Sequence, residues 1–251
     1  MNLALVQARM GSSRLPGKVL KPINGNPLIK TLIDRISKAK KLDKIIVATS
    51  KNKEDDTLVS FCEINEIDYF RGSDWDVLDR FYQAAVSLDK TPKIIVRICA
   101  DNPLHSHKVV DFVMEEFEKS GKEYFSNSNQ EPDFLEDGFD VEVFTFKALE
   151  SAWKNAKLLS EREHVCPYIK NNFSCGWKKV NQEYTYKLSV DTQEDLDAVN
   201  KIFQELNHIP DFGINEVVDL LKRKPEILEI NKTSIINSGF KKSLDEDKIV
   251  K

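Results

Sequence analysis

Long apolar runs are absent from this chain of 251 residues. No stretch reaches the length of about eighteen consecutive apolar residues that a membrane-spanning helix needs. The sequence also opens directly on the apolar residues 3–6, without the basic segment and hydrophobic stretch of a secretory signal. These two absences predict a cytoplasmic protein that has no membrane partner.

Cysteine is scarce, and no two cysteines form a Cys-x-x-Cys pair. The four are Cys62, Cys99, Cys166 and Cys175. Their scatter argues against a zinc knuckle or a redox motif and predicts reduced, mostly buried thiols. His105 and His107 have no third side chain nearby at the spacing of a metal site, so we expect no metal centre there.

A strong excess of charge of one sign is missing as well. The formal net charge is -4, and charged residues make up 31% of the chain. Such a surface gives no electrostatic reason for binding DNA or RNA, so nucleic acid is not an expected partner. The length fits one large α/β domain or a main domain with an appendage.

Short strand-like runs alternate with helical patterns through most of the sequence, which predicts βαβ units and a mostly parallel sheet covered on both faces. The expected strands are residues 3–6, 44–48, 94–99 and, with a weaker pattern, 68–70. Residues 140–146 alternate between apolar and polar side chains, which indicates a half-exposed strand in a small antiparallel insertion.

A last strand is expected at residues 187–190. Thr192 then begins a helix as its N-cap, with Asp195 at the capping-box position. From Pro210 onward the pattern weakens to one more helix, and residues 231–251 are polar. We therefore expect a main domain, residues 1–209, and a C-terminal helix and tail, residues 210–251.

A loop rich in glycine, serine and cations follows the first strand. It contains Ala8, Arg9, Gly11, Ser12, Ser13, Arg14, Gly17 and Lys18. Backbone N–H groups and three cations around one concave point can hold a polyphosphate. A P-loop is excluded because five residues separate Gly11 from Gly17 and Val19 replaces the magnesium-binding hydroxyl residue. Any magnesium would therefore need carboxylates elsewhere, and the alternative for this loop is a glycine-rich surface turn.

Two aspartates follow expected strands at the edge where open parallel sheets bind their ligands. Asp101 comes after the strand at 94–99, and Asp191 comes directly after 187–190. Magnesium commonly takes one or two carboxylates together with substrate phosphates, so Asp101 and Asp191 are the candidate metal ligands. Taken singly, Asp101 also suits a turn and Asp191 a helix entry.

A further acidic pair lies in the expected insertion. Asp140 and Glu142 are two apart on a strand and would share one face. Together with Glu163 and His164 downstream, they would suit a hydroxyl-rich or amine-bearing substrate. The alternative is an exposed polar strand face.

Five stretches together resemble the cytidylyltransferase family that contains the CMP-Kdo and CMP-acylneuraminate synthetases, most closely its spore-coat polysaccharide branch. They are residues 7–18, 97–104, 137–144, 162–165 and 191–196. The resemblance implies a GT-A-like, Rossmann-related α/β nucleotidyltransferase fold, often dimeric. It also implies a reaction in which an acceptor oxygen attacks the α-phosphorus of CTP and pyrophosphate leaves.

Site roles follow from the resemblance. The implied nucleotide-binding residues are Ala8, Arg9, Gly11, Ser12, Ser13, Arg14, Lys18, Arg97 and Asp101. The implied catalytic residues are Arg14, Lys18, Asp101 and Asp191, with the two aspartates holding Mg²⁺. The implied substrate-binding residues are Asp140, Glu142, Glu163 and His164.

The expected function is CTP-dependent activation of a sugar acid or phosphorylated acceptor for surface polysaccharide synthesis, by a homodimer. Two other functions stay open. A GT-A-type glycosyltransferase would consume a nucleotide sugar and release a nucleoside mono- or diphosphate, although the cationic loop favours a free triphosphate. A non-catalytic nucleotide-binding protein would bind its ligand without turnover.

Overall fold

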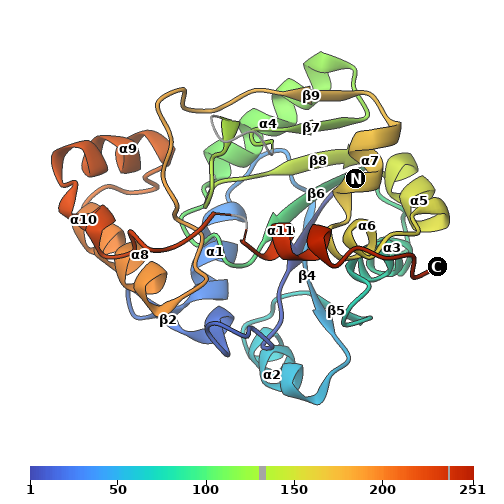
Figure 1. The fold of residues 1–251 in the computed structure, drawn as a ribbon, viewed down its shortest axis with the longest axis horizontal. Coiled ribbons are helices and arrows are strands. Elements are labelled where there is room, and N and C mark those ends of the chain that lie inside the picture. The colour runs from blue at the N-terminus through green and yellow to red at the C-terminus, as the bar shows by residue number, and fades with distance from the viewer. Residues whose placement is uncertain (130–133, 237) are drawn as a thin grey trace.

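The computed structural model describes residues 1–129, 134–236 and 238–251, and it is built around one mixed sheet (Figure 1). The strands are β1 (Asn2–Gln7), β4 (Lys44–Ser50), β5 (Tyr69–Gly72), β6 (Ile94–Cys99), β7 (Tyr124–Ser126), β8 (Glu142–Thr145) and β9 (Cys175–Trp177). Their order is β5-β4-β1-β6-β8-β7-β9. All neighbours are parallel except that β8 runs antiparallel to both β6 and β7. The predicted α/β class, with a mostly parallel sheet, is confirmed.

Helices cover both faces of the sheet. They are α1 (Leu28–Ile36), α2 (Asp56–Ile64), α3 (Val77–Val86), α4 (His107–Ser120), α5 (Phe146–Asn155), α6 (Leu159–His164), α7 (Cys166–Asn172), α8 (Gln193–Leu206), α9 (Ile214–Arg223), α10 (Glu226–Glu229) and α11 (Ser238–Asp245). In the central strand β1, Ala4 and Val6 pack into the core under α1, α4 and α8, while Leu3 and Leu5 pack into the core under α3, α5 and α7. Burial on both faces explains why β1 reads as a continuous apolar run.

The four strands expected in the first half of the chain are present within a few residues of their expected bounds. The alternating segment at 140–146 forms β8, which begins at Glu142 and ends at Thr145. A separate two-stranded antiparallel sheet joins β2 (Pro22–Ile23) to β3 (Asn26–Pro27). The cap of α8 is confirmed, because Asp195 N donates to Thr192 Oγ1 over 3.3 Å and Thr192 N donates to Asp195 Oδ2 over 3.0 Å.

The strand expected at residues 187–190 is wrong. The backbone there pairs with a side chain and not with a neighbouring strand: Leu188 N and Ser189 N both donate to Asp137 Oδ2, over 2.8 and 2.7 Å. Val190 N then donates to the carbonyl oxygen of Asp101 over 2.8 Å. These bonds hold the segment next to the end of β6, so Asp191 lies beside Asp101 even though no strand forms.

The chain after residue 209 adds α9, α10 and α11. Val217 and Leu221 of α9 belong to the same buried cluster as Ala4 of β1. Figure 1 shows α8, α9 and α10 together at one end of the molecule, while α11 lies across the front and leads to the C-terminus beside α3 and α6. The division at residue 209 stays a prediction.

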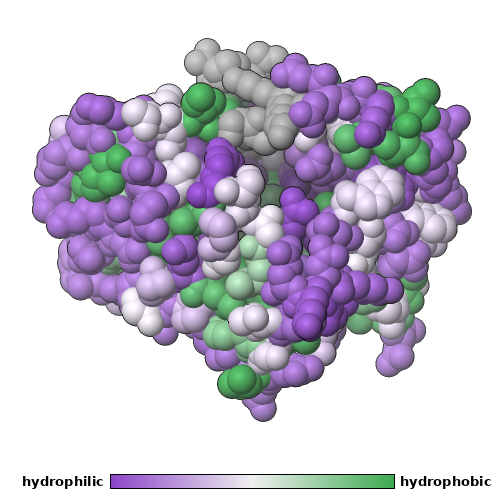
Figure 2. Space-filling view, turned by 60° about the horizontal axis from the view of Figure 1, so that its bottom comes forward, coloured by the Kyte–Doolittle hydropathy of each residue, from purple (hydrophilic) through white to green (hydrophobic). Residues whose placement is uncertain are grey.

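Hydrophilic residues cover most of the face shown in Figure 2, and the hydrophobic ones form only small groups there. No helix in the described part of the chain combines the length and the apolar character that crossing a membrane requires.

Candidate active site at the carboxyl ends of β1 and β6

The loop after β1 is folded back on itself by backbone hydrogen bonds. Ser12 N and Gly17 N both donate to the carbonyl oxygen of Met10, over 2.9 and 3.0 Å. Gly17 has a φ of 68°, a left-handed conformation that suits glycine. The buried Asp55 fixes the start of the loop, because its Oδ1 accepts from Met10 N over 2.6 Å and its Oδ2 accepts from Ser50 N over 3.1 Å. The conformation of this loop is therefore fixed by specific hydrogen bonds, which an incidental surface turn would not need.

Lys18 joins the two aspartates that the sequence placed at strand ends. Its Nζ donates to Asp101 Oδ2 over 2.9 Å, to Asp191 Oδ1 over 3.1 Å and to the carbonyl oxygen of Val190 over 2.8 Å. Burial alone would lower the pKa of Lys18, but the two carboxylates outweigh it and the pKa is raised. Three residues far apart in the sequence thus meet at one point.

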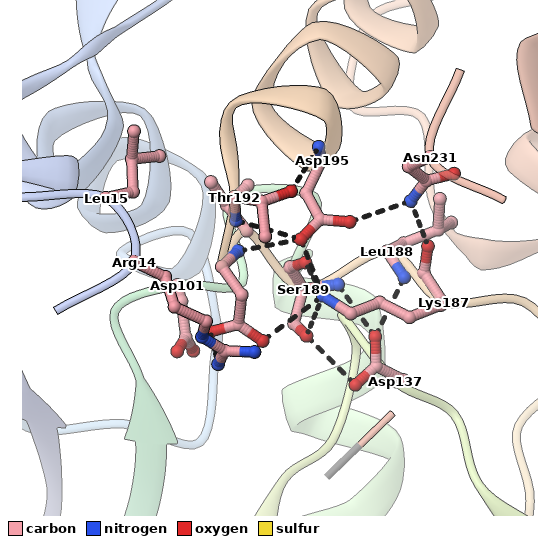
Figure 3. Close-up of polar contacts among 12 residues, drawn as sticks. Arg14, Leu15, Asp101, Asp137, Lys187, Leu188, Ser189, Thr192, Asp195 and Asn231 are labelled. Carbon is pink, nitrogen blue, oxygen red and sulfur yellow. Dashed lines mark hydrogen bonds and ion pairs between the residues drawn. The ribbon is translucent and has the colours of Figure 1, made fainter. Parts of the chain in front are cut away.

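Two more cations surround Asp191. Arg14 Nη2 lies 2.9 Å from Asp191 Oδ1, and Lys187 Nζ lies 3.3 Å from Asp191 Oδ2. Burial would raise the pKa of Asp191, but Lys18, Lys187 and Arg14 together lower it. Figure 3 shows Arg14 and Asp101 next to each other on one side of this group and Lys187 on the other. The carboxylate of Asp191 is therefore held ionised.

Lys187 was missed by the sequence analysis. Its Nζ donates over 3.1 Å to Asp195 Oδ2, the oxygen that also caps α8, and to the carbonyl oxygen of Ser189. Asn231 Nδ2 donates to the other oxygen of Asp195 over 2.9 Å (Figure 3). The lysine is only four residues before Asp191, but no motif around it in the sequence indicates that its side chain turns back to that carboxylate.

Two cavities open on either side of Asp101 and Asp191. The first, the loop pocket, has a volume of about 220 Å³ and is lined by the cationic loop. The second, the inner pocket, has a volume of about 240 Å³ and reaches back to β8 and α7. The residues lining both pockets are Arg14, Cys99, Asp101 and Asp191. The two aspartates therefore stand where a molecule in one pocket would meet a molecule in the other.

All the loop residues predicted to bind nucleotide line the loop pocket. They are Ala8, Arg9, Gly11, Ser12, Ser13, Arg14 and Lys18. Arg9 also makes an exposed ion pair with Asp74 over 3.0 Å. Arg97, which was expected beside the nucleotide, lines the inner pocket instead.

A buried charge cluster forms one wall of the inner pocket. Glu142 lies opposite Arg97 in the register of β8 and β6, and its two oxygens accept from Arg97 Nη1 over 2.5 Å, from Lys170 Nζ over 2.8 Å and from Tyr124 Oη over 2.7 Å. Burial would raise the pKa of Glu142, but Lys170 and Arg97 lower it well below its usual range. Two cations share one carboxylate, so this cluster carries a net positive charge beside the cavity.

Asp140 lies next to this cluster in a different electrostatic environment. Its Oδ1 accepts from Asn102 Nδ2 over 3.0 Å, and its carbonyl oxygen lies 3.0 Å from His105 Nε2. Burial, together with the negative charges of Asp137 and Glu142, raises the pKa of Asp140 to about 7. Glu142 and Asp140 both line the inner pocket, although Asp140 precedes β8 and so does not share a strand face with Glu142.

Asp140→Asn should change how stability depends on pH. A carboxyl group whose pKa is higher in the folded than in the unfolded protein makes folding less favourable as pH rises between the two values. Between about pH 4 and pH 7 the free energy of unfolding of the wild type should therefore fall by on the order of 2 kcal/mol more than that of Asp140→Asn. Urea titrations at pH 5 and pH 8 measure this. An identical pH dependence in both proteins would contradict the assignment.

Glu163 Oε2 lies 4.0 Å from His164 Nε2, but of the two residues only His164 lines the inner pocket. Burial lowers the pKa of His164 to about 4. Glu163 also accepts from Ser243 Oγ of α11 over 2.7 Å. The neighbouring Arg162 is buried in a bidentate pair with Asp76, which ties α6 to the start of α3.

Asp101 and Asp191 are the side chains of this site that could hold a metal ion. Carboxylate oxygens of Asp101 and Asp191 both lie within hydrogen-bond distance of one ammonium group, so they already converge on a single positive charge. The described residues contain no group of three or more His, Cys, Asp or Glu side chains placed to hold a metal. Two carboxylates are nevertheless a sufficient protein contribution where substrate phosphates supply further oxygens.

The mostly parallel sheet, with a cationic loop after β1 and carboxylates at the ends of neighbouring segments, defines an α/β nucleotidyltransferase fold. The family model described as cytidylyltransferase matches residues 3–234. The chain therefore belongs to the cytidylyltransferase family.

Relatives of nearly full length support this placement. An uncharacterised protein of Methanocaldococcus jannaschii is 40% identical over 238 residues, covering 91% of this chain and 93% of that protein. The spore coat polysaccharide biosynthesis protein SpsF of Bacillus subtilis is 29% identical, covering 89% and 95%. The solved structure of a cytidylyltransferase from Leptospira borgpetersenii superposes with a TM-score of 0.83 at 28% identity, covering 93% of this chain and 98% of that one.

Proposed function

We propose that this protein transfers CMP from CTP to an acidic acceptor and releases pyrophosphate. The observation that carries the proposal is that Lys18 of the loop pocket binds Asp101 and Asp191, which line both pockets. In the reaction, an acceptor oxygen forms a bond to the α-phosphorus, the bond from the α-phosphorus to the bridging oxygen breaks, and pyrophosphate leaves with that electron pair. The proton of the acceptor passes to water or to a base.

CTP would occupy the loop pocket. Arg14 and Lys18 supply positive charge for the β- and γ-phosphates, and the backbone of Gly11 lines the same pocket. Neutralising these oxygens lowers the repulsion that an incoming nucleophile meets and stabilises the charge that develops on pyrophosphate. Asp101 and Asp191 would hold Mg²⁺, which when bound supplies further charge neutralisation to the phosphates.

The acceptor would occupy the inner pocket. Arg97 and Lys170, which share the single carboxylate of Glu142, supply cationic donors on one wall of this pocket and would suit an acceptor with a carboxylate or phosphate group. Arg97 Nε is buried and has no hydrogen-bond partner among the described residues, so it offers a donor for such a group. The name of the Bacillus subtilis relative, a spore coat polysaccharide biosynthesis protein, supports an acceptor used in surface polysaccharide synthesis.

A pyrophosphate-release screen tests the proposal. CTP, UTP, ATP and GTP are each incubated with Mg²⁺ and a panel of sugar acids and phosphorylated acids. Release with CTP and an acidic acceptor is the expected result. Nucleoside mono- or diphosphate release from a nucleotide sugar would instead identify a glycosyltransferase. Nucleotide binding without turnover across the whole panel would identify a non-catalytic protein.

Lys18→Ala gives this screen a second arm. Loss of the ammonium group should raise the KM for CTP by about tenfold or more, while the KM for the acceptor changes little. Lys21→Ala is the matched control, because Lys21 follows the same loop but lies outside the lining of the loop pocket. An unchanged KM for CTP in Lys18→Ala would contradict the position given to the triphosphate.

A further inference from the structure

The last residues of the chain, 238–251, form what we call the C-terminal strap: α11 and the tail that follows it. The strap lies beyond the residues that the family model matches, 3–234. In Figure 1 it crosses the front of the molecule and ends beside α3 and α6. Its sequence is polar and carries no motif, yet the structure places it against the candidate active site.

The tail of the strap is tied to the first turn of α6 and to the residues just before it by directed hydrogen bonds. Ser160 N and Oγ donate to the carboxylate of Asp247 over 3.0 and 2.8 Å. Leu159 N donates to the carbonyl oxygen of Lys248 over 2.9 Å, and Val250 N donates to the carbonyl oxygen of Lys157 over 2.8 Å. These bonds lie on both sides of an antiparallel bridge between Leu158 and Ile249. The tail is therefore docked at defined positions.

Helix α11 brings an aromatic ring to the inner pocket. Phe240 lines that pocket, and its ring centroid lies 4.8 Å from that of His164 in an edge-to-face arrangement with an interplanar angle of 74°. One turn later, the buried Ser243 donates to Glu163 Oε2 over 2.7 Å. The strap thus contacts both members of the Glu163–His164 motif through two different side chains.

Phe240 lies on the part of the inner pocket that the loop pocket does not share. Leu135 and Pro167 line the same cavity and, with Phe240, offer carbon surface, whereas Arg97, Lys170 and Glu142 offer charge. A molecule in the inner pocket could therefore contact both charged groups and carbon surface.

We propose that the C-terminal strap completes the acceptor site and that Phe240 determines which acceptors fit. This inference rests on the proposed function and adds to it a class of acceptor. The acid group of the acceptor faces Arg97 and Lys170, and a carbon substituent, such as a deoxy, methyl or acyl group, packs against the ring of Phe240. CTP does not contact the strap, because Phe240 does not line the loop pocket.

The kinetic test compares Phe240→Ala with Leu244→Ala. Leu244 lies on the same helix, is 48% exposed and does not line the inner pocket, so it is the matched control. Phe240→Ala should raise the KM for the acceptor by about fivefold or more and leave the KM for CTP within about twofold. It should also admit acceptors with bulkier substituents. An unchanged KM for the acceptor, or an equal rise in both KM values, would overturn the proposal.

A second readout does not depend on activity. Burial is the main cause of the low pKa of His164, and the ring of Phe240 packs against His164. Phe240→Ala should therefore raise the pKa of His164, measured by NMR in the free protein, by about one unit. Leu244→Ala should not. Asp247→Ala, which loosens the strap outside the pocket, should shift the pKa in the same direction. An unchanged His164 titration in both Phe240→Ala and Asp247→Ala would show that the strap does not cover the site.

The two readouts keep this inference separate from the proposed function. If the wild type releases no pyrophosphate with any acceptor, the proposed function is wrong. The proposed class of acceptor is then wrong too, whether or not the pKa of His164 changes in Phe240→Ala. If the wild type releases pyrophosphate but the KM for the acceptor is the same in Phe240→Ala, only the proposed role of the strap is wrong.

Discussion

Asp101→Asn should lower kcat for pyrophosphate release by a factor of about 10² to 10³ and leave the fold intact. The carboxylate of Asp101 pairs with Lys18 and lines both pockets, so its charge stands where the acceptor and the α-phosphate would meet. Asparagine keeps the shape and one oxygen but removes the negative charge that a magnesium ion requires. Pyrophosphate release at saturating CTP and acceptor measures the effect.

The structural cost of Asp101→Asn should be small. The hydrogen bond that fixes the neighbouring segment, from Val190 N, ends on the backbone carbonyl of Asp101 and not on its side chain. Circular dichroism and the melting temperature should therefore match the wild type. Asp34→Asn, which alters an exposed pair with Lys30, should leave turnover unchanged. Near-normal turnover in Asp101→Asn would remove this residue from the catalytic centre.

Strands of the sheet could be predicted where a continuous segment is buried. Strands β1 and β6 are buried on both faces, so each appears in the sequence as a mostly apolar run. The segment at 187–190 alternates polar and apolar residues like a half-exposed strand, but its backbone N–H groups donate to the side chain of Asp137, which lies 51 residues before Leu188 and which no local pattern reveals. Strands β7 and β9 have only three residues each, too few for a period to show.

The candidate site was predictable as far as topology could place it. The carboxyl ends of parallel strands meet at one edge, so the loop after β1 and the aspartate after β6 had to be neighbours. Lys170 and Phe240 come from helices whose positions depend on packing, and nothing in their sequence neighbourhoods indicates a pocket. The register that sets Glu142 opposite Arg97 is likewise a result of tertiary structure.

Glu142→Gln should destabilise the protein by about 3 kcal/mol, because it leaves two half-buried cations without their shared, buried carboxylate. Arg97 and Lys170 both point at Glu142, and Tyr124 donates its hydroxyl proton to the same group. Glutamine fills the same space, but it is neutral and has only one oxygen that can accept hydrogen bonds. Without the negative charge, Arg97 and Lys170 repel each other in a wall of low dielectric constant. Urea unfolding at pH 7 measures the loss.

The pH dependence of this loss identifies its cause. The pKa of Glu142 is lowered in the folded protein, so the stability it contributes is present above the ordinary glutamate value and is lost as pH falls through the lower folded value. The difference between wild type and Glu142→Gln should therefore shrink as pH falls below about 4. Glu118→Gln, at an exposed pair with Lys41, should cost less than about 1 kcal/mol at every pH. If the loss at pH 7 in Glu142→Gln were as small as in that control, the cluster would not depend on this carboxylate, and the positive wall assigned to the acceptor site would lose its electrostatic basis.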